Sequence, residues 1–512
     1  MNRPIASFTC AVAAVLGATS SASIAHAQTA MASPTPDATA STPPQPGSVE
    51  ERLHALEEEI RTLRAARSTP TPAPAEPAPA PASPPAVNTD YGPAVTPFAF
   101  GDFSWSPANY APAESLLHYG VFTGEVRLDV PFHYSLANPV DNTISGSSEV
   151  FRSNEFQVTQ AGIGGDFYYR GAHARLMTQF GMYSMTTPRN DASTGRGQWS
   201  LDNAYRYISE AYAGYHINAL AGINIQAGIF MSYVGLWSYY NFDNWTYQPS
   251  YVSSNTPWFF NGVRVQIYVN EHLKIEPWLV NGWQAYGQFN QAPGVGLQVR
   301  WAPNDSVNVI GNQYFGSDTL GVPDRLRVHT DDSVMLRFFN RPQSSGLTRV
   351  AGSLTVDAGC EFGNGAGGAA NVTCGEQFFI GFMAYARLWF HRDMFAFTVG
   401  GGAINNPGRY LVLMPPINGA TAYSGSPYFT YNKGDPFHAW DMQTTFDYMP
   451  TRNVTFRLEY THRAADVPYF SGHGGVTPPG GNTGAPGSTV MGWSPDLSTT
   501  EDRMTAALMV RL

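Results

Sequence analysis

The feature that most constrains this chain is a strict alternation of apolar and polar residues between positions 221 and 303. A period of two is that of a β-strand, whose successive side chains point to opposite faces. The alternating residues that share one face are apolar: Ile223, Ile225, Ala227, Ile229, Met231, Val263, Val265, Ile267, Val269, Val295, Leu297, Val299 and Trp301. The residues between them, on the opposite face, are polar or charged: Asn224, Gln226, Arg264, Gln266, Gln298 and Arg300. These strands therefore need two environments. Either a soluble sandwich buries the apolar face, or an outer-membrane barrel turns it to lipid and faces a watery lumen with the other.

Composition favours the barrel. Only 13% of the 512 residues are charged and 13% are aromatic, which suits a lipid-facing band with aromatic girdles. After the N-terminus no apolar run approaches the roughly 20 residues of a membrane-spanning helix, so a membrane location would require a barrel. The net charge of -10 without a basic stripe argues against a nucleic-acid partner.

The N-terminal 27 residues have the pattern of a secretory signal peptide. Arg3 supplies the positive start, residues 5–17 the apolar centre, and Ala25-His26-Ala27 the cleavage site. This pattern predicts an exported chain. Residues 28–47 are rich in Ala, Thr, Ser and Pro and are expected to be disordered.

Residues 48–67 are expected to form a short coiled-coil helix, followed by a Pro/Ala-rich linker over 68–90. The apolar residues of the helix are spaced by four and three, as in an a/d seam: Val49, Leu53, Leu56, Ile60 and Leu63. Fewer than three heptads are marginal alone, so the coiled coil would form where another contact, such as a trimeric barrel, holds copies together. The alternative is a solvated amphipathic helix.

The composition changes near position 91, and residues 91–512 are expected to form an all-β transmembrane antiparallel barrel of about 16 strands. Bacterial barrels have even strand numbers, and one of seventeen candidates is therefore expected to be false or one to be missing. The candidates are 97–106, 123–134, 155–169, 173–183, 205–217, 222–233, 259–269, 273–286, 294–302, 307–315, 328–339, 350–357, 377–390, 394–405, 439–448, 454–462 and 503–512.

The predicted connections fall into two sizes. Tight turns at 270–272, 391–393 and 450–453 alternate with long loops at 235–258, 411–438 and 464–500. Short periplasmic turns and long extracellular loops are typical of outer-membrane barrels, whereas a sandwich has no reason to separate its loops by length.

Several motifs carry a family resemblance. They are Asp202-Asn203-Ala204-Tyr205-Arg206-Tyr207, Gly228-Ile229-Phe230-Met231-Ser232-Tyr233, Tyr239-Tyr240-Asn241-Phe242-Asp243, Asn281-Gly282-Trp283 and Ala465-Asp466-Val467-Pro468-Tyr469-Phe470. With these motifs, residues 91–512 resemble the β-barrel porin-2 family of Gram-negative outer membranes. The helix before the barrel is also similar to that of coiled-coil-bearing trimeric porins. The resemblance implies passive transport in the outer membrane of a Gram-negative bacterium without fixing a substrate, and it supplies no catalytic residues. No cofactor is expected, and the N-terminal segment is expected to lie in the periplasm.

The loop at 235–258 is unusually aromatic. Its candidate constriction residues are Trp237, Tyr239, Tyr240, Phe242, Trp245, Tyr247, Tyr251 and Trp258. Folded into a lumen, they would narrow the pore and offer flat faces to solutes. Folded outward, they would pack on the rim or against a neighbouring subunit, and the sequence leaves both arrangements open.

Strand parity also assigns charged side chains to the lumen. The pore-lining candidates are Glu125, Arg127, Asp129, Arg175, Arg264, Lys274, Glu276, Arg300, Arg337, Arg387, Arg457, Glu459 and Arg511. Opposed basic and acidic walls would orient dipolar solutes, and an arginine cluster would favour anions. Alternatively, these side chains form salt bridges that hold the wall and set no selectivity.

Two cysteines remain after removal of the signal peptide. Cys360 and Cys374 flank a Gly-rich loop, and in an oxidising compartment such a pair is expected to form a disulfide. No further cysteine or close histidine accompanies them, so no metal site is expected.

These patterns favour a porin that lets small hydrophilic solutes diffuse through a water-filled barrel. The expected partners are outer-membrane lipid, the solutes, two further copies in a homotrimer, and peptidoglycan through the N-terminal segment. No catalytic motif appears, so no enzyme is expected. The alternative is a structural protein that tethers the outer membrane to the cell wall and whose barrel is closed or plugged.

Overall fold

The computed structural model describes residues 54, 56–62, 97–108, 116–147, 149–188, 191, 193, 196–288, 290–318, 322–364, 371, 373–407, 437–479 and 492–512. The chain divides into two compact units, Met1–Val87 and Asn88–Leu512. In the first unit, residues 54 and 56–62 are helical, with Leu56 and Ile60 exposed. The signal peptide, residues 28–47, the linker at 68–90 and the rest of the predicted helix lie outside the described residues. The coiled coil therefore stays a prediction.

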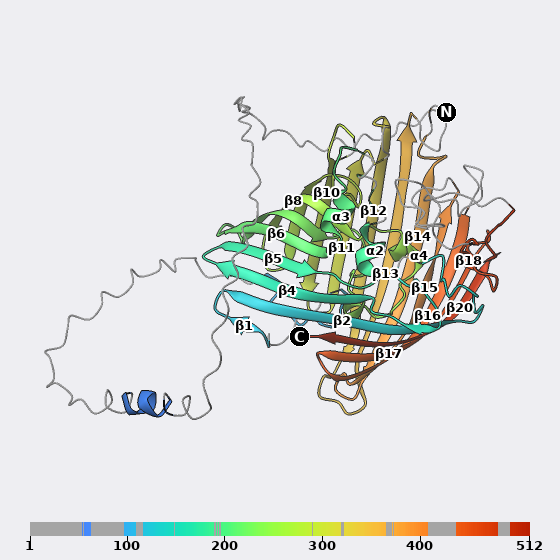
Figure 1. Ribbon diagram of the computed structural model, residues 1–512. Coiled ribbons are helices and arrows are strands. Elements are labelled where there is room, and N and C mark those ends of the chain that lie inside the picture. The colour runs from blue at the N-terminus through green and yellow to red at the C-terminus, as the bar shows by residue number, and fades with distance from the viewer. Residues whose placement is uncertain are drawn as a thin grey trace, which may run out of the picture. The chain divides into compact units, whose positions relative to one another are not determined.

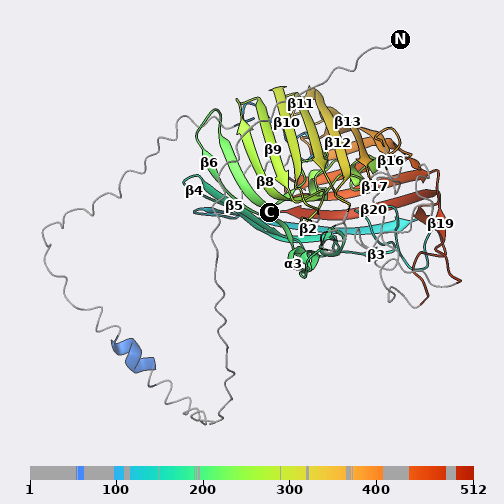
Figure 2. The same ribbon diagram turned by 90° about the horizontal axis from the view of Figure 1, so that it is seen from above.

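The second unit is a closed antiparallel barrel of 16 strands (Figure 1, Figure 2). Each strand pairs with its neighbours in the chain, and β2 closes the ring because it pairs with both β4 and β20. The barrel strands are β2 (Phe122–Ser135), β4 (Gln160–Tyr169), β5 (Ala172–Thr178), β6 (Ile208–Ile217), β7 (Ile223–Met231), β8 (Phe259–Tyr268), β9 (Leu273–Val280), β10 (Gly294–Asn304), β11 (Val307–Gly316), β12 (Arg325–Asn340), β13 (Leu347–Gly363), β14 (Phe378–Phe390), β15 (Phe395–Asn406), β16 (Phe437–Thr451), β17 (Val454–Ala465) and β20 (Thr500–Arg511).

Short elements lie in the connections and before the barrel. They are β1 (His118–Tyr119), β3 (Glu155–Phe156), α2 (Tyr183–Thr186), α3 (Leu201–Tyr205), η3 (Asn241–Asp243), α4 (Tyr251–Ser254), β18 (Phe470–Ser471) and β19 (Leu497–Ser498). Helix α4 is buried and contacts β14, β15 and β16, so it belongs to the interior of the ring.

Sixteen of the seventeen predicted strands match barrel strands, and the expected strand at 97–106 is wrong. That stretch forms turns, and Phe98 has a positive φ of 62°, which a β-strand does not contain. Its Trp105 is completely buried, in a cluster that includes Phe103 and side chains of several barrel strands. Phe103 and Trp105 therefore pack in the interior of the barrel and do not face lipid.

Several predicted boundaries also shift. The expected strand at 155–169 joins the barrel only from Gln160, the one at 173–183 ends at Thr178, and the one at 350–357 extends to Gly363. The expected strand at 205–217 begins only at Ile208, because Leu201–Tyr205 forms α3, and the expected strand at 273–286 ends at Val280. The predicted segregation of loops holds. Short turns such as 170–171, 305–306 and 452–453 alternate around the ring with long connections such as 179–207, 232–258 and 466–499. The predicted loop at 411–438 lies mostly outside the described residues.

The two faces of the strands have opposite character. In β16, Trp440 and Met442 are exposed, whereas the intervening Asp441, Gln443 and Asp447 are buried. The same inversion recurs in β12, β13, β17 and β20, where large apolar side chains face outward and polar ones face inward. A soluble sandwich would show the reverse. Large apolar side chains on the outside and charges inside are the pattern of a membrane-spanning barrel.

Candidate channel lumen

The connection between β7 and β8, residues 232–258, folds across the inner wall, and we call it the inner loop. Its backbone amides are held by wall carboxylates. Glu459 on β17 accepts hydrogen bonds from the backbone N–H groups of Tyr247 at 2.5 Å and Gln248 at 2.8 Å. Asp441 on β16 accepts one from the backbone N–H of Tyr251 at 2.7 Å. Charged acceptors make strong hydrogen bonds in a buried setting, so these contacts fix the path of the loop.

Wall arginines hold the carbonyl groups of the same loop. Arg457 donates to the carbonyl oxygens of Asn241 at 3.2 Å and Asn244 at 2.7 Å, and Arg387 donates to that of Trp245 at 3.1 Å. Both guanidinium groups also pair with Asp447, each with an N–O distance of 2.7 Å. The loop starts on β7 and ends on β8, yet its anchors stand on β14, β16 and β17. It therefore spans the interior.

The middle of the loop is also held by an ion-pair cluster. Asp243 in η3 pairs with Arg127 on β2 at 3.0 Å and with Arg511 on β20 at 3.2 Å. The guanidinium of Arg127 also stacks over the ring of Tyr240, 3.8 Å from its centroid. The sequence placed Asp243 in a family motif but did not predict its role as an ion-pair partner, because a single acidic residue inside an aromatic loop carries no periodic signal.

The eight aromatic candidates of the inner loop are placed among interior side chains. Seven of them are buried, and Phe242 is half-buried. Trp237 packs edge-to-face on Tyr385 of β14, with ring centroids 4.9 Å apart, and Tyr239 contacts Tyr183 of α2 at 4.6 Å. The rings are thus packed against other groups along most of their surface.

A second segment, residues 97–108, also lies inside the barrel, and we call it the entry segment. The Trp105 indole donates to the carbonyl of Asp305 in the β10–β11 turn at 3.1 Å, and the Trp245 indole donates to the carbonyl of Trp105 at 3.2 Å. Arg337 on β12 donates to the carbonyl of Asp102 at 3.1 Å. The entry segment is therefore clamped between the inner loop and the wall, at the end of the barrel that carries the short turns.

The remaining pore-lining candidates fall into groups on the inner face. On one side Arg175 pairs with Glu125 at 2.8 Å and with Glu210, which the sequence argument did not include, also at 2.8 Å. Arg127 and Arg511 pair with the same Glu125. This group is an ion-pair network in which every arginine has an acidic partner.

Other candidates form a second group or stand apart. Glu276 pairs with Lys274 at 2.5 Å and with Arg264 at 3.7 Å. Arg300 donates to Asn308 at 3.1 Å and stacks over Phe98 of the entry segment, 4.2 Å from the ring centroid.

Two further candidates, Asp129 and Arg337, contact the inner loop and the β10–β11 turn respectively. Asp129 accepts from the side-chain amide of Asn241 at 3.0 Å, and Arg337 pairs with Asp305 at 2.5 Å.

Several interior residues were missed although strand parity could have found them. Asp441 and Asp447 share the inward parity of β16, and Arg463 and Arg503 share that of β17 and β20. Arg463 stacks over the ring of Tyr251, 3.9 Å from its centroid. The entry segment offered no such signal, because its residues are in turns.

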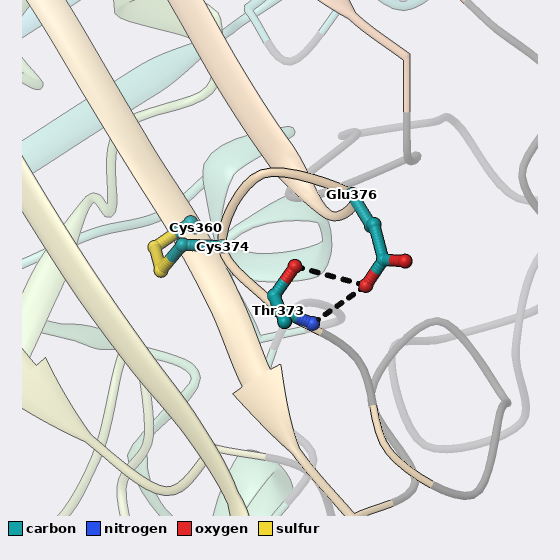
Figure 3. The surroundings of a disulfide bond; sticks show 4 residues. All are labelled: Cys360, Thr373, Cys374 and Glu376. Carbon is teal, nitrogen blue, oxygen red and sulfur yellow. Dashed lines mark hydrogen bonds between the residues drawn. A yellow bond between two sulfur atoms is a disulfide. The ribbon is translucent and has the colours of Figure 1, made fainter. Parts of the chain in front are cut away.

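The two cysteines lie where β13 ends and the next loop returns. Cys360 and Cys374 form a disulfide with a Cα–Cα distance of 5.1 Å (Figure 3). Beside it, the Glu376 carboxylate accepts hydrogen bonds from the backbone N–H of Thr373 at 2.8 Å and from its hydroxyl at 2.9 Å. This corner belongs to the long-loop end of the barrel and is separate from the inner loop.

Among the helices that the structure describes, none has the length and apolar character needed to cross a membrane. Within the described ranges, no group of three or more His, Cys, Asp and Glu side chains is arranged to hold a metal ion.

The closed ring, apolar outside and charged inside, defines an outer-membrane β-barrel of the porin class. The family described as "Putative beta-barrel porin-2, OmpL-like" matches residues 122–491, and the chain belongs to this family. The predicted family and outer-membrane location are thereby confirmed.

Solved outer-membrane proteins are similar to this chain at low sequence identity and with TM-scores below 0.5. OmpT of Vibrio cholerae is 8% identical, with a TM-score of 0.43, over 78% of this chain and 100% of that one. The outer-membrane channel DcaP of Acinetobacter baumannii is 10% identical, with a TM-score of 0.42, over 76% and 97%. An anion-selective porin from Comamonas acidovorans is 7% identical, with a TM-score of 0.44, over 76% and 99%. No curated protein matches the chain significantly in sequence.

Proposed function

We propose that this protein is a porin through which small hydrophilic solutes diffuse passively, without a cofactor and without catalysis. The observation that carries the proposal is the inner wall of buried charged side chains in a closed barrel, facing away from an apolar outer surface. Such a wall is stable only beside water, polar loops or solutes, because buried charges without partners are costly. The thirteen pore-lining candidates would then filter solutes by charge.

In this proposal the inner loop is the constriction. Its anchors on Glu459, Asp441 and Arg457 keep it across the lumen, so the open width would depend on these contacts. The width of the lumen would exclude large solutes, and the charges on the wall would select among the smaller ones. We further propose a homotrimer, with the N-terminal segment in the periplasm and in contact with peptidoglycan.

The test is single-channel recording of the mature protein in a planar bilayer under a salt gradient. Stepwise openings in multiples of three are expected for a trimeric porin. The sign of the reversal potential would tell whether the inward arginines or the inward carboxylates dominate. A folded, heat-modifiable barrel that never conducts would refute the open channel.

A second candidate function is a structural tether with a plugged barrel. One observation favours it: both the inner loop and the entry segment occupy the interior, and Trp105 of the entry segment is completely buried there. Deletion of residues 28–90 distinguishes the two functions. A channel would keep its conductance after the deletion, whereas a tether would lose its attachment to the cell wall, measured as outer-membrane blebbing and loss of co-sedimentation with peptidoglycan.

A further inference from the structure

A cavity of about 410 Å³ opens at the short-turn end of the barrel, between the inner loop, the entry segment and the wall. The wall side comes from β13, β14, β16 and β17 and from the turns that join β14 to β15 and β16 to β17. Ser104 and Ser106 of the entry segment and Trp245 of the inner loop close the other sides. Its volume lies within the range of small-molecule sites, which is roughly 300–1,000 Å³.

The lining of this cavity carries an excess of positive charge. Five arginines line it, and only two carboxylates, Asp243 and Asp393, do so. The arginines are Arg349, Arg387, Arg392, Arg452 and Arg457. The surplus of cations would attract an anionic solute and repel a cationic one.

The partners of these arginines show where the surplus lies. Arg457 and Arg387 share Asp447, and Arg349 pairs with both Asp102 at 3.1 Å and Asp393 at 3.2 Å. Arg392 and Arg452, on the two turns, are exposed and make no ion pair with any described residue. Two guanidinium groups at the mouth are thus free to bind a carboxylate in the paired geometry that arginine favours.

Part of the remaining lining is apolar, and Trp245, Trp389 and Met449 line the cavity beside polar residues such as Asn244 and Thr455. Trp389 and Trp245 meet edge-to-face with ring centroids 5.7 Å apart, and Met449 adds a thioether beside them. Arg387 lies over the Trp389 ring, 5.1 Å from its centroid. An inorganic anion would leave this apolar wall unused, and a neutral sugar would leave the charge surplus unused. A small acid with a compact apolar body uses both.

We propose that this cavity binds a small organic acid, with its carboxylate between Arg392 and Arg452 and its apolar body against Trp389. The inference names a solute class for the proposed channel and rests on that function. The site would hold such acids at the periplasmic exit of the lumen and favour them over neutral and cationic solutes of the same size.

The test is calorimetric titration of the full mature protein in detergent with three probes of similar size, benzoate, benzyl alcohol and benzylamine, and with inorganic phosphate as a smaller anion. Benzoate is expected to bind at least about tenfold more tightly than each of the other three. Equal binding of benzyl alcohol would overturn the role of charge. Equal binding of phosphate would overturn the role of the apolar wall.

Variants locate the site. The double substitution R392Q/R452Q is expected to weaken benzoate binding about tenfold. R341Q is the matched control, because Arg341 is exposed in the β12–β13 turn at the same end but does not line the cavity. If R341Q weakened benzoate binding by the same factor, the effect would come from general surface charge, and the proposed site would be wrong.

Conductance in potassium chloride, recorded on the same preparations, separates this inference from the proposed function. Normal conductance without benzoate binding would overturn the site and leave the channel. Benzoate binding without conductance would overturn the channel and leave the cavity as a binding site of a closed barrel.

Discussion

Glu459 is the best single point at which to test whether the inner loop is held by the wall. Its side chain is 2% exposed and accepts the backbone N–H groups of Tyr247 and Gln248. In E459Q the amide keeps one acceptor oxygen, whereas its NH₂ group would face an N–H donor. At least one hydrogen bond to a charged group is lost, which costs about 1.5–3 kcal/mol. Since about 1.4 kcal/mol is a factor of ten, local opening of the loop should become about 10- to 100-fold more frequent.

Hydrogen exchange measured by mass spectrometry in detergent reports directly how often the inner loop opens. Peptides covering residues 244–252 should lose about 10- to 100-fold of their protection in E459Q, while the barrel strands keep theirs. The control is E361Q. Glu361 is equally buried and pairs with wall arginines, and no contact to the inner loop is described for it. Unchanged exchange in E459Q, or an equal effect in E361Q, would refute the anchoring of the loop by this carboxylate.

Three further predictions follow from other contacts. Replacing Cys360 and Cys374 by serine should lower the free energy of unfolding by about 3 kcal/mol, the loop-entropy value for a loop of this length, and an unchanged heat-modifiability midpoint would contradict this. Burial alone would raise the pKa of Asp141, but hydrogen bonds from the 476–477 backbone and Thr143 hold its pKa below the usual range. This contact should therefore persist down to about pH 4 and be lost at lower pH, where protease cleavage near Val476 should rise in the wild type but be pH-independent in D141N. Trp105→Ala should loosen the entry segment and raise single-channel conductance, and an unchanged conductance would show that the segment does not limit flow.

Much of the barrel could be predicted from the sequence because its physics is local. Lipid outside and polar groups inside impose a period of two on every strand, and that period alone located sixteen strands. The false strand at 97–106 shows the limit of this reasoning. The aromatic residues Phe98, Phe103 and Trp105 are compatible both with a lipid-facing strand and with a segment packed inside the barrel. Only the turns that interrupt this stretch show that it is not a strand.

The contents of the lumen could not be predicted in the same way, because they depend on contacts between distant positions. Arg127 pairs with a residue 116 positions away, and Arg457 bonds a carbonyl 216 positions away. Strand alternation predicts whether a side chain points into the barrel or out of it, but it does not predict which residue that side chain contacts. Asp447 illustrates the difference: parity places it inside, yet its role comes from the two arginines that it holds, Arg387 and Arg457.

The same long-range contacts link the width of the lumen to its charge. Arg457 and Arg387 each bind the inner loop through a carbonyl and the wall through Asp447, so the groups that line the interior also position the loop that narrows it. A substitution that removes one of these guanidinium groups would leave Asp447 buried with one partner fewer and free part of the loop at once. Charge selectivity and pore width are therefore coupled at this wall. The two exposed turn residues, Arg392 and Arg452, have no such double role, which is why their substitution isolates the effect of charge.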